Sequence, residues 1–357
     1  MSLFVRSLLV RDFRGIRRVR TAGEEGEKAI ELAKLNVLVG PNNSGKSTVL
    51  EALSLLPHPL QARDLITGCH KAGFVYNFLH GDKSGACLVY RYYGRAELSY
   101  VDGTGRHLEI VIKKELGPLH IKMLIDGWDT NGHGPAPISE RLGLDYEREF
   151  HSAVMFFLGE KESRLPVETP GYLSALWRQF FEKIDLWRLV ERVNAHITVA
   201  REVLSPALNE QLVELLQKKD GFYVRKVFPD GTWDYIRVED LGDGVEKALA
   251  ALVVFEALKP KLILWDDLEA SLHPNLLMAV LTWLAERDWQ VVLATHSVDV
   301  LYRLLDLDKA ARNSTRVIML QKTPDDVLLW RALTVDELED LMLLKQDPRL
   351  VAGALGL

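Results

Sequence analysis

The sequence predicts an α/β protein with a mixed, mostly parallel main sheet and an inserted lobe of β-strands and helices. After residue 241, apolar runs typical of buried strands alternate with helix-like segments, as in proteins whose parallel strands are joined by helices. The apolar run 35–39 ends at a glycine-rich loop that leads into a helix. Between residues 73 and 126 the pattern changes to short β-rich runs separated by Gly/Asp turns. Two kinds of sheet are therefore expected.

Composition and charge narrow the class of protein. The chain has 357 residues, 48% hydrophobic and 26% charged, so it can bury a substantial core. Its net charge of −6 excludes a surface that is basic all round. Cys69 and Cys87 are the only cysteines and do not form a CxxC pair, which disfavours a disulfide framework or structural zinc. The arginine-rich start lacks the apolar core of a signal peptide, and we expect a cytoplasmic protein with no membrane partner.

The main fold is assigned from apolar periodicity and from helix-breaking residues, and it is expected to occupy residues 1–60 and 238–357. The expected strands are 4–12, a strand ending near 19, 35–39, 262–266, 291–294 and 317–320, with 154–158 returning to the same sheet. The expected helices are 47–56, 244–258, the segments after Pro274 and after Ser297, and 335–345.

The inserted lobe is expected to span residues 61–237. Its antiparallel sheet would cover about 73–126, with residues 89–93 as one of the strands. A helical part would follow at about 139–218, then a hairpin at about 222–238 around Pro229-Asp230-Gly231. No heptad pattern lasts long enough for a coiled-coil arm.

The strongest motif is Gly40-Pro41-Asn42-Asn43-Ser44-Gly45-Lys46-Ser47-Thr48, which matches G-x-x-x-x-G-K-[ST] between a buried strand and a helix. Backbone amides of such a loop cradle phosphates at the helix N-terminus. Lys46 would neutralise the β- and γ-phosphate oxygens, and Ser47 would bind Mg²⁺. The sequence therefore predicts a P-loop that binds ATP with Mg²⁺ through residues 40–48.

A second motif is the apolar run 262–265 followed by Asp266 and Asp267. Taken alone, two acids that end a strand form a solvated turn or a helix cap. Behind a complete P-loop they match the Walker B arrangement, in which Asp266 would hold Mg²⁺ through water and Asp267 would orient or deprotonate the attacking water.

Two weaker motifs follow the same logic. Thr295-His296-Ser297 ends an apolar strand, so His296 would contact the γ-phosphate, although a lone histidine there is also an ordinary surface or capping residue. Leu241-Gly242-Asp243-Gly244 precedes a helix and would form an anion site, although a simple turn and N-cap explain it equally well.

In this order the four motifs resemble the ABC-type ATPases, in their SMC-like and RecF-like branch, and specifically the OLD-like AAA ATPases. The opening Arg11-Asp12-Phe13-Arg14-Gly15 is similar to the start of that family, which places Arg14 among the ATP-binding residues. Leu50-Glu51-Ala52-Leu53 is similar to the helix that follows its P-loop. The segment 266–274 resembles its extended Walker B motif. The resemblance covers about residues 1–56 and 238–300.

The resemblance implies that two subunits dimerise head to tail around two ATPs. Leu241, Gly242, Asp243 and Gly244 would then act in trans, as the signature motif, and residues 270–273 would form the D-loop at the dimer seam. Asp267 stands where the family has Glu, which implies slow hydrolysis, with Glu269 as a poorer substitute. Gly242 replaces the usual Ser of the signature. About sixty residues follow Ser297, too few for a Toprim nuclease domain, so any nuclease effector would be a separate protein.

The function favoured by the resemblance is an ATPase switch in DNA repair, genome maintenance or anti-phage defence. Local basic clusters are compatible with direct DNA binding, but solvated faces explain them as well. They are Arg6, Arg11, Arg14, Arg17, Arg18 and Arg20 near the start, Lys113-Lys114, and Lys218-Lys219 with Arg225-Lys226. The alternatives are the nucleotide-binding subunit of an ABC transporter, which would carry a fuller signature, and a P-loop small-molecule kinase, which would not need residues 241–244.

Overall fold

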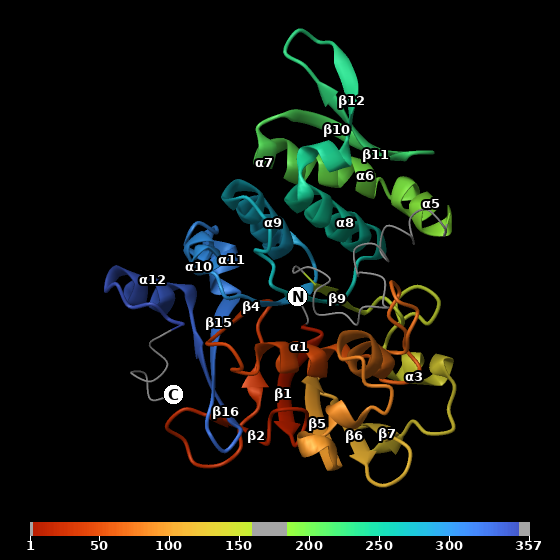
Figure 1. Cartoon of the computed structure of the whole chain (residues 1–357), viewed down its shortest axis with the longest axis vertical. Helices are drawn as coiled ribbons and strands as arrows, with labels where there is room; N and C mark the ends of the chain where they lie inside the picture. The colour runs from red at the N-terminus through yellow and green to blue at the C-terminus, as the bar shows by residue number, and fades with distance from the viewer. Residues whose placement is uncertain (1–2, 159–183, 350–357) are drawn as a thin grey trace.

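The computed structural model describes residues 3–158 and 184–349 (Figure 1). The described residues form three sheets: a mixed sheet that carries the P-loop, an antiparallel sheet beside it, and a small antiparallel sheet at the other end of the molecule. Among these residues no helix is long and apolar enough to cross a membrane.

The main sheet has the order β2-β16-β15-β4-β14-β13-β9. Its strands are β2 (Arg18–Thr21), β16 (Val327–Leu333), β15 (Thr315–Lys322), β4 (Leu35–Val39), β14 (Gln290–Ala294), β13 (Leu262–Asp266) and β9 (Val154–Leu158). All neighbours are parallel except β15 and β16. Every residue of β4, β13 and β14 is buried, which explains their continuous apolar runs. The mixed sheet predicted from the sequence is confirmed.

Helices connect and cover this sheet. They are α1 (Lys46–Ser54), α8 (Asp243–Leu258), α9 (Pro274–Glu286), α10 (Val298–Leu305), α11 (Lys309–Asn313) and α12 (Val335–Leu343). Helix α1 packs across β9, β13 and β14, directly behind the strands that carry the predicted acids and switch. Helix α12 begins with a capping box between Thr334 and Glu337, and Leu338 anchors it in the core.

The second sheet has the order β3-β1-β5-β6-β7-β8. Its strands are β3 (Ile30–Glu31), β1 (Val5–Arg11), β5 (Gly94–Asp102), β6 (His107–Lys114), β7 (His120–Ile125) and β8 (Trp128–Asp129). The sheet does not belong to an insertion alone, because β1 pairs with β5 in antiparallel register. Helix α3 (Pro135–Leu142) follows it and ends at Gly143.

The predicted start of this sheet at residue 73 and the predicted strand at 89–93 are wrong. Residues before Gly94 form α2 (Lys71–Gly73), a π-helix η1 (Phe74–Leu79) and two 3₁₀ turns, η2 (Ala86–Leu88) and η3 (Tyr90–Tyr92). Arg91 and Tyr92 adopt positive φ values of 54° and 64°, which break an extended run. Tyr90 instead donates its backbone N–H to Asp12 O at 2.7 Å.

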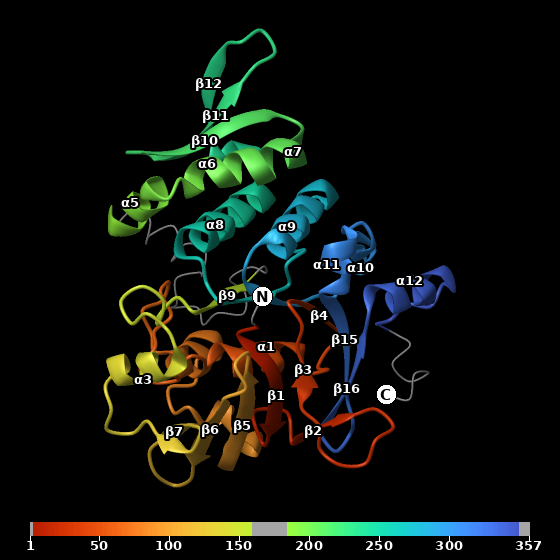
Figure 2. The ribbon, with the colours of Figure 1, turned by 180° about the vertical axis from the view of Figure 1, so that it is seen from behind.

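The third sheet lies at the far end of the molecule (Figure 2) and consists of β10 (Gln211–Lys218), β11 (Gly221–Val227) and β12 (Trp233–Arg237). Leu212, Leu215 and Val224 are buried, and β10 packs on α6 (Ala195–Val199), η5 (Ala200–Leu204) and α7 (Ser205–Leu208). Helix α5 (Ile184–Arg192) precedes them. The hairpin predicted at 222–238 is confirmed. The predicted helical segment 139–218 extends too far, because α7 ends at Asn209, which has a φ of 52°. Its residues 159–183 lie outside the described part.

Candidate nucleotide-binding site

The predicted P-loop joins β4 to α1, as expected from the sequence. Gly40 has a φ of 149°, and a Cβ there would lie 2.1 Å from Leu320 O, so only glycine fits under β15. Gly45 is the N-cap of α1 with a φ of 97°, and no side chain caps the helix. The first amides of α1 therefore have no side-chain cap, which is the arrangement that receives a phosphate group.

Lys46 and Ser44 show how the loop is prepared for an anion. Lys46 is buried, and its Nζ donates to Gly40 O at 2.9 Å and to Pro41 O at 3.1 Å. Its ammonium group is thus held inside the loop. Ser44 is 1% exposed, and its buried Oγ has no hydrogen-bond partner among the described residues. Buried hydroxyl groups are normally hydrogen-bonded, so the Oγ of Ser44 is available to a ligand bound in the loop. The loop therefore fits the triphosphate of a nucleotide.

The second part of the site is a hydrogen bond from Ser47 Oγ to Asp266 Oδ2 at 2.9 Å. It joins the first turn of α1 to the end of β13, and Asp266 is 5% exposed. A hydroxyl beside a carboxylate is a suitable donor set for Mg²⁺, which keeps several waters and also binds substrate phosphates. Among the described residues no cluster of three or more Asp, Glu, His or Cys could hold a metal alone. Ser47 and Asp266 would accordingly share the ion with the nucleotide.

Asp267 lies next to Asp266 and is also buried. Its φ is 52°, in the left-handed region that Asp adopts more readily than most residues other than Gly, and its N–H donates to Ala294 O at 3.0 Å. In the parallel register Asp266 stands opposite Ala294, the residue before Thr295. The backbone thus brings Asp267 to the end of β14, where the predicted switch begins.

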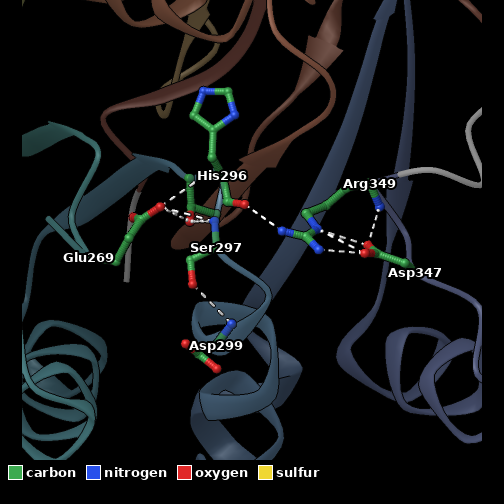
Figure 3. Close-up of polar contacts among 7 residues, drawn as sticks. Glu269, His296, Ser297, Asp299, Asp347 and Arg349 are labelled. Carbon is green, nitrogen blue, oxygen red and sulfur yellow. Dashed lines mark hydrogen bonds and ion pairs between the residues drawn. The ribbon is translucent and has the colours of Figure 1, made fainter.

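The switch residues Thr295-His296-Ser297 follow β14 directly. Thr295 donates its N–H to Leu38 O at 3.2 Å, which fixes the switch beside the strand that leads into the P-loop. His296 is exposed, and its ring points away from both Glu269 and Arg349 (Figure 3). Ser297 is the N-cap of α10 and accepts from Asp299 N at 3.1 Å. The three predicted elements of the site therefore meet at one edge of the sheet.

The predicted signature forms the N-terminus of α8 and contacts the predicted D-loop. Gly242 is the N-cap with a φ of 97°, and a Cβ on Gly244 would lie 2.1 Å from Ser271 O. Lys247 of the same helix donates to Ser271 Oγ at 3.2 Å. An open groove of about 350 Å³ lies here, lined by Leu208, Gly242, Asp243, Gly244, Ser271 and His273 among others. Signature and D-loop thus share one solvent-facing surface.

Arg14, which the resemblance assigns to ATP, contacts the helix that follows the P-loop. Its Nε lies 2.6 Å from Glu51 Oε2, and His80 Nε2 lies 2.8 Å from Glu51 Oε1. Arg14 has a φ of 53°, so this contact is held by an uncommon backbone conformation. A direct role of Arg14 on ATP stays a proposal.

Two residues at the site were not assigned these roles from the sequence. Glu269 accepts hydrogen bonds from the switch, whereas the sequence suggested only a substitute catalytic acid. Arg349 donates to His296 O at 2.6 Å. It lies far along the chain from the motifs, and no local pattern marks it, so only the folded structure reveals it.

Comparison with known proteins agrees with this geometry. No curated protein matches the chain. A Smc head bound to the C-winged helix domain of ScpA is similar with a TM-score of 0.58 at 16% identity, covering 93% of this chain and 99% of that one. The Smc head domain derived from Pyrococcus furiosus is similar with a TM-score of 0.56 at 13% identity, covering 96% of this chain and 98% of that one. The SMC head domain from Thermotoga maritima has a TM-score of 0.50 at 13% identity, covering 93% of this chain and 100% of that one. These likenesses show the fold of an SMC-type ATPase head.

The family described as "AAA domain, putative AbiEii toxin, Type IV TA system" matches residues 35–92 and 176–301, just over half of the chain. The matched ranges contain the P-loop, the two acids, the switch and the signature. The chain belongs to this AAA family of P-loop ATPase domains, with the fold of the ABC-type, SMC-like heads.

Proposed function

We propose that the protein binds Mg·ATP, hydrolyses it slowly, and uses ATP to close a homodimer. The observation that carries the proposal is the 2.9 Å contact between Ser47 Oγ and Asp266 Oδ2, because it joins the P-loop helix to the strand that carries the acids. Residues 40–48 and Lys46 would hold the triphosphate. Bound Mg²⁺ would neutralise charge on the phosphates.

Asp267 is the residue we assign to the attacking water. It would orient the water and accept its proton while the oxygen attacks the γ-phosphorus and the bond to the bridging oxygen breaks, releasing ADP and phosphate. Asp is one methylene shorter than Glu, so its carboxylate reaches less far, which supports slow turnover. His296, exposed at the end of β14, would contact the γ-phosphate.

Dimerisation is supported by the groove that Gly244 and Ser271 share. Two copies arranged head to tail would each present Leu241, Gly242, Asp243 and Gly244 to the nucleotide held by the other. Among the biological roles, the OLD-like and RecF-like resemblance supports DNA repair, genome maintenance or anti-phage defence in the cytoplasm, with a separate nuclease or other effector. DNA is the ligand we propose for the closed dimer.

The decisive experiment measures the ATPase rate per subunit as a function of protein concentration. Asp267→Ala is the test variant, and Lys46→Ala is the control, in which nucleotide should not bind. We expect the rate to rise with concentration, and Asp267→Ala to accumulate as an ATP-bound dimer in light scattering. Concentration-independent turnover by a monomer would overturn the trans signature. Duplex DNA is tested separately at low salt with and without ATP, where unchanged fluorescence anisotropy would remove it as direct ligand.

A further inference from the structure

The switch is held by charged residues on both sides (Figure 3). Glu269, which follows the two acids of β13, contacts it from one side, and Arg349, from the last described segment of the chain, contacts it from the other. We propose that Glu269 and Arg349 are positioning residues that together fix the backbone of His296. The effect of these two residues on ATP hydrolysis rests on the proposed function, whereas their hold on the backbone of His296 does not.

Glu269 uses one oxygen for three hydrogen bonds. Oε1 accepts from Thr295 Oγ1 at 2.7 Å, from His296 N at 2.9 Å and from Ser297 N at 3.0 Å. The second oxygen, Oε2, is buried and has no hydrogen-bond partner among the described residues. A carboxylate that receives two consecutive backbone amides and a hydroxyl forms charge-assisted bonds, which are stronger than neutral ones. Its geometry is therefore that of a clamp on the loop.

Arg349 completes the clamp. Its Nη1 donates to His296 O at 2.6 Å, so the N–H and the C=O of the same residue are both held by charged side chains. Asp347 orients the guanidinium, with Nε to Oδ1 at 2.9 Å and Nη2 to Oδ2 at 2.5 Å. This pair raises the pKa of Arg349, first through the hydrogen bond to Asp347, so the guanidinium is stabilised in the orientation that reaches His296 O.

The consequence is a fixed direction for the Cα–Cβ bond of His296, from which the ring extends. With N–H and C=O both fixed, the peptide planes on either side of His296 cannot rotate freely, and the ring points away from the clamp. Preorganised contacts of this kind act on the rate of a reaction more than on ground-state binding. Oε1 of Glu269 is engaged by the loop and Oε2 is buried, so the carboxylate is not arranged to take a proton from water.

The test compares Glu269→Gln, which keeps a carbonyl acceptor, with Glu269→Leu, which keeps volume but accepts nothing. Glu286→Leu, at the exposed end of α9, is the control for adding a leucine. If Glu269 positions the switch, Glu269→Leu should lower kcat about tenfold or more without changing nucleotide affinity. The kcat of Glu269→Gln should then lie closer to the wild-type value than to that of Glu269→Leu. A general base would instead lose on the order of 10²–10⁴ in both variants, which would overturn the inference.

A second readout needs no nucleotide and no activity. In hydrogen exchange of the free protein, the His296 amide should exchange about tenfold faster or more in Glu269→Leu, while the Thr295 amide, bonded to Leu38 O, serves as internal reference. Arg349→Met should also speed exchange in residues 296–298, and Arg349→Lys should recover part of the protection. Unchanged His296 exchange in Glu269→Leu would contradict the clamp even if the protein proved to have no ATPase activity.

Discussion

Gln290 and Val5 exchange two hydrogen bonds that join the two large sheets of the molecule. Gln290 Oε1 accepts from Val5 N at 2.9 Å, and its Nε2 donates to Val5 O at 2.8 Å and to Ala33 O at 2.9 Å. Gln290 opens β14 and is 1% exposed, whereas Val5 opens β1. A single amide thus pairs with both backbone groups of Val5 and with the half-buried carbonyl of Ala33.

Replacement of Gln290 by leucine should therefore destabilise the protein strongly. The buried N–H and C=O of Val5 would lose their partner, at a cost of about 2–4 kcal/mol, whereas Ala33 O would keep its bond from Asn36 Nδ2. The free energy of unfolding in urea measures this, with the exposed Gln346→Leu as control. Equal unfolding midpoints for wild type and Gln290→Leu would show that this amide does not join the sheets.

Ser47→Ala should weaken the effect of Mg²⁺ on nucleotide binding. The variant removes the hydroxyl that lies 2.9 Å from Asp266 and would bind the ion. Titration of nucleotide with and without Mg²⁺ should show the gain due to the ion reduced about tenfold, which is about 1.4 kcal/mol. Ser54→Ala is the matched control, because Ser54 lies in the same helix and its hydroxyl donates to Glu51 O. An equal loss in both variants would mean that Ser47 has no special role.

Gly244→Ala should prevent dimerisation and spare nucleotide binding. The added Cβ would lie 2.1 Å from Ser271 O, so the D-loop must move away from α8. Gly134→Ala, where nothing lies within 4 Å, is the control. Light scattering with ATP should show Gly244→Ala as a monomer up to concentrations about tenfold above those at which wild type dimerises. If Gly244→Ala dimerised at the same concentrations as the wild type, the contact between Gly244 and Ser271 would not be needed for dimerisation.

His58 should make the protein less stable in mild acid. Burial, which disfavours the charged imidazolium, lowers the pKa of His58 from 6.5 to about 4. The Nδ1 of its ring accepts from the N–H groups of Leu60 and Gln61, and its Nε2 lies 3.0 Å from Thr130 Oγ1. Between pH 6.5 and 4, His58 is therefore protonated in the unfolded chain but neutral in the folded protein. Stability is full above pH 6.5 and falls as the pH drops through this window, by about 1–2 kcal/mol at pH 5.

His58→Asn tests this assignment, because an amide oxygen can still accept from the two N–H groups while carrying no titratable nitrogen. Urea unfolding at pH 5.0 and 7.5 should show a smaller difference between the two pH values in the variant than in the wild type. An identical pH dependence in both proteins would place the acid sensitivity elsewhere.

The sequence predicted the site better than the surrounding lobe, and the reason is physical. The strands before Gly40, Asp267 and Thr295 are buried on both faces, so their apolar runs are unambiguous, and the chemistry follows each strand at once. Residues 89–93 are also rich in aromatic side chains, but Arg91 and Tyr92 have positive φ values, and the N–H of Tyr90 donates to Asp12 O, which is distant in sequence.

The pairing of β1 with β5 and the contact of Arg349 with His296 are equally distant in sequence. No local pattern encodes such contacts, because they follow from how already formed elements pack. For the same reason the sequence named Glu269 as a second acid, whereas its three hydrogen bonds to the switch became visible only in the folded chain.

The central claim is that Lys46 and the amides of residues 40–48 bind the triphosphate of Mg·ATP. The most direct measurement is the dissociation constant of a fluorescent ATP analogue with Mg²⁺, for wild type and Lys46→Ala, with unchanged unfolding midpoints as the control for folding. We predict saturable binding by the wild type and an affinity at least about a hundredfold weaker in the variant. Equal affinity of the two proteins, or no binding by the wild type, would contradict the claim.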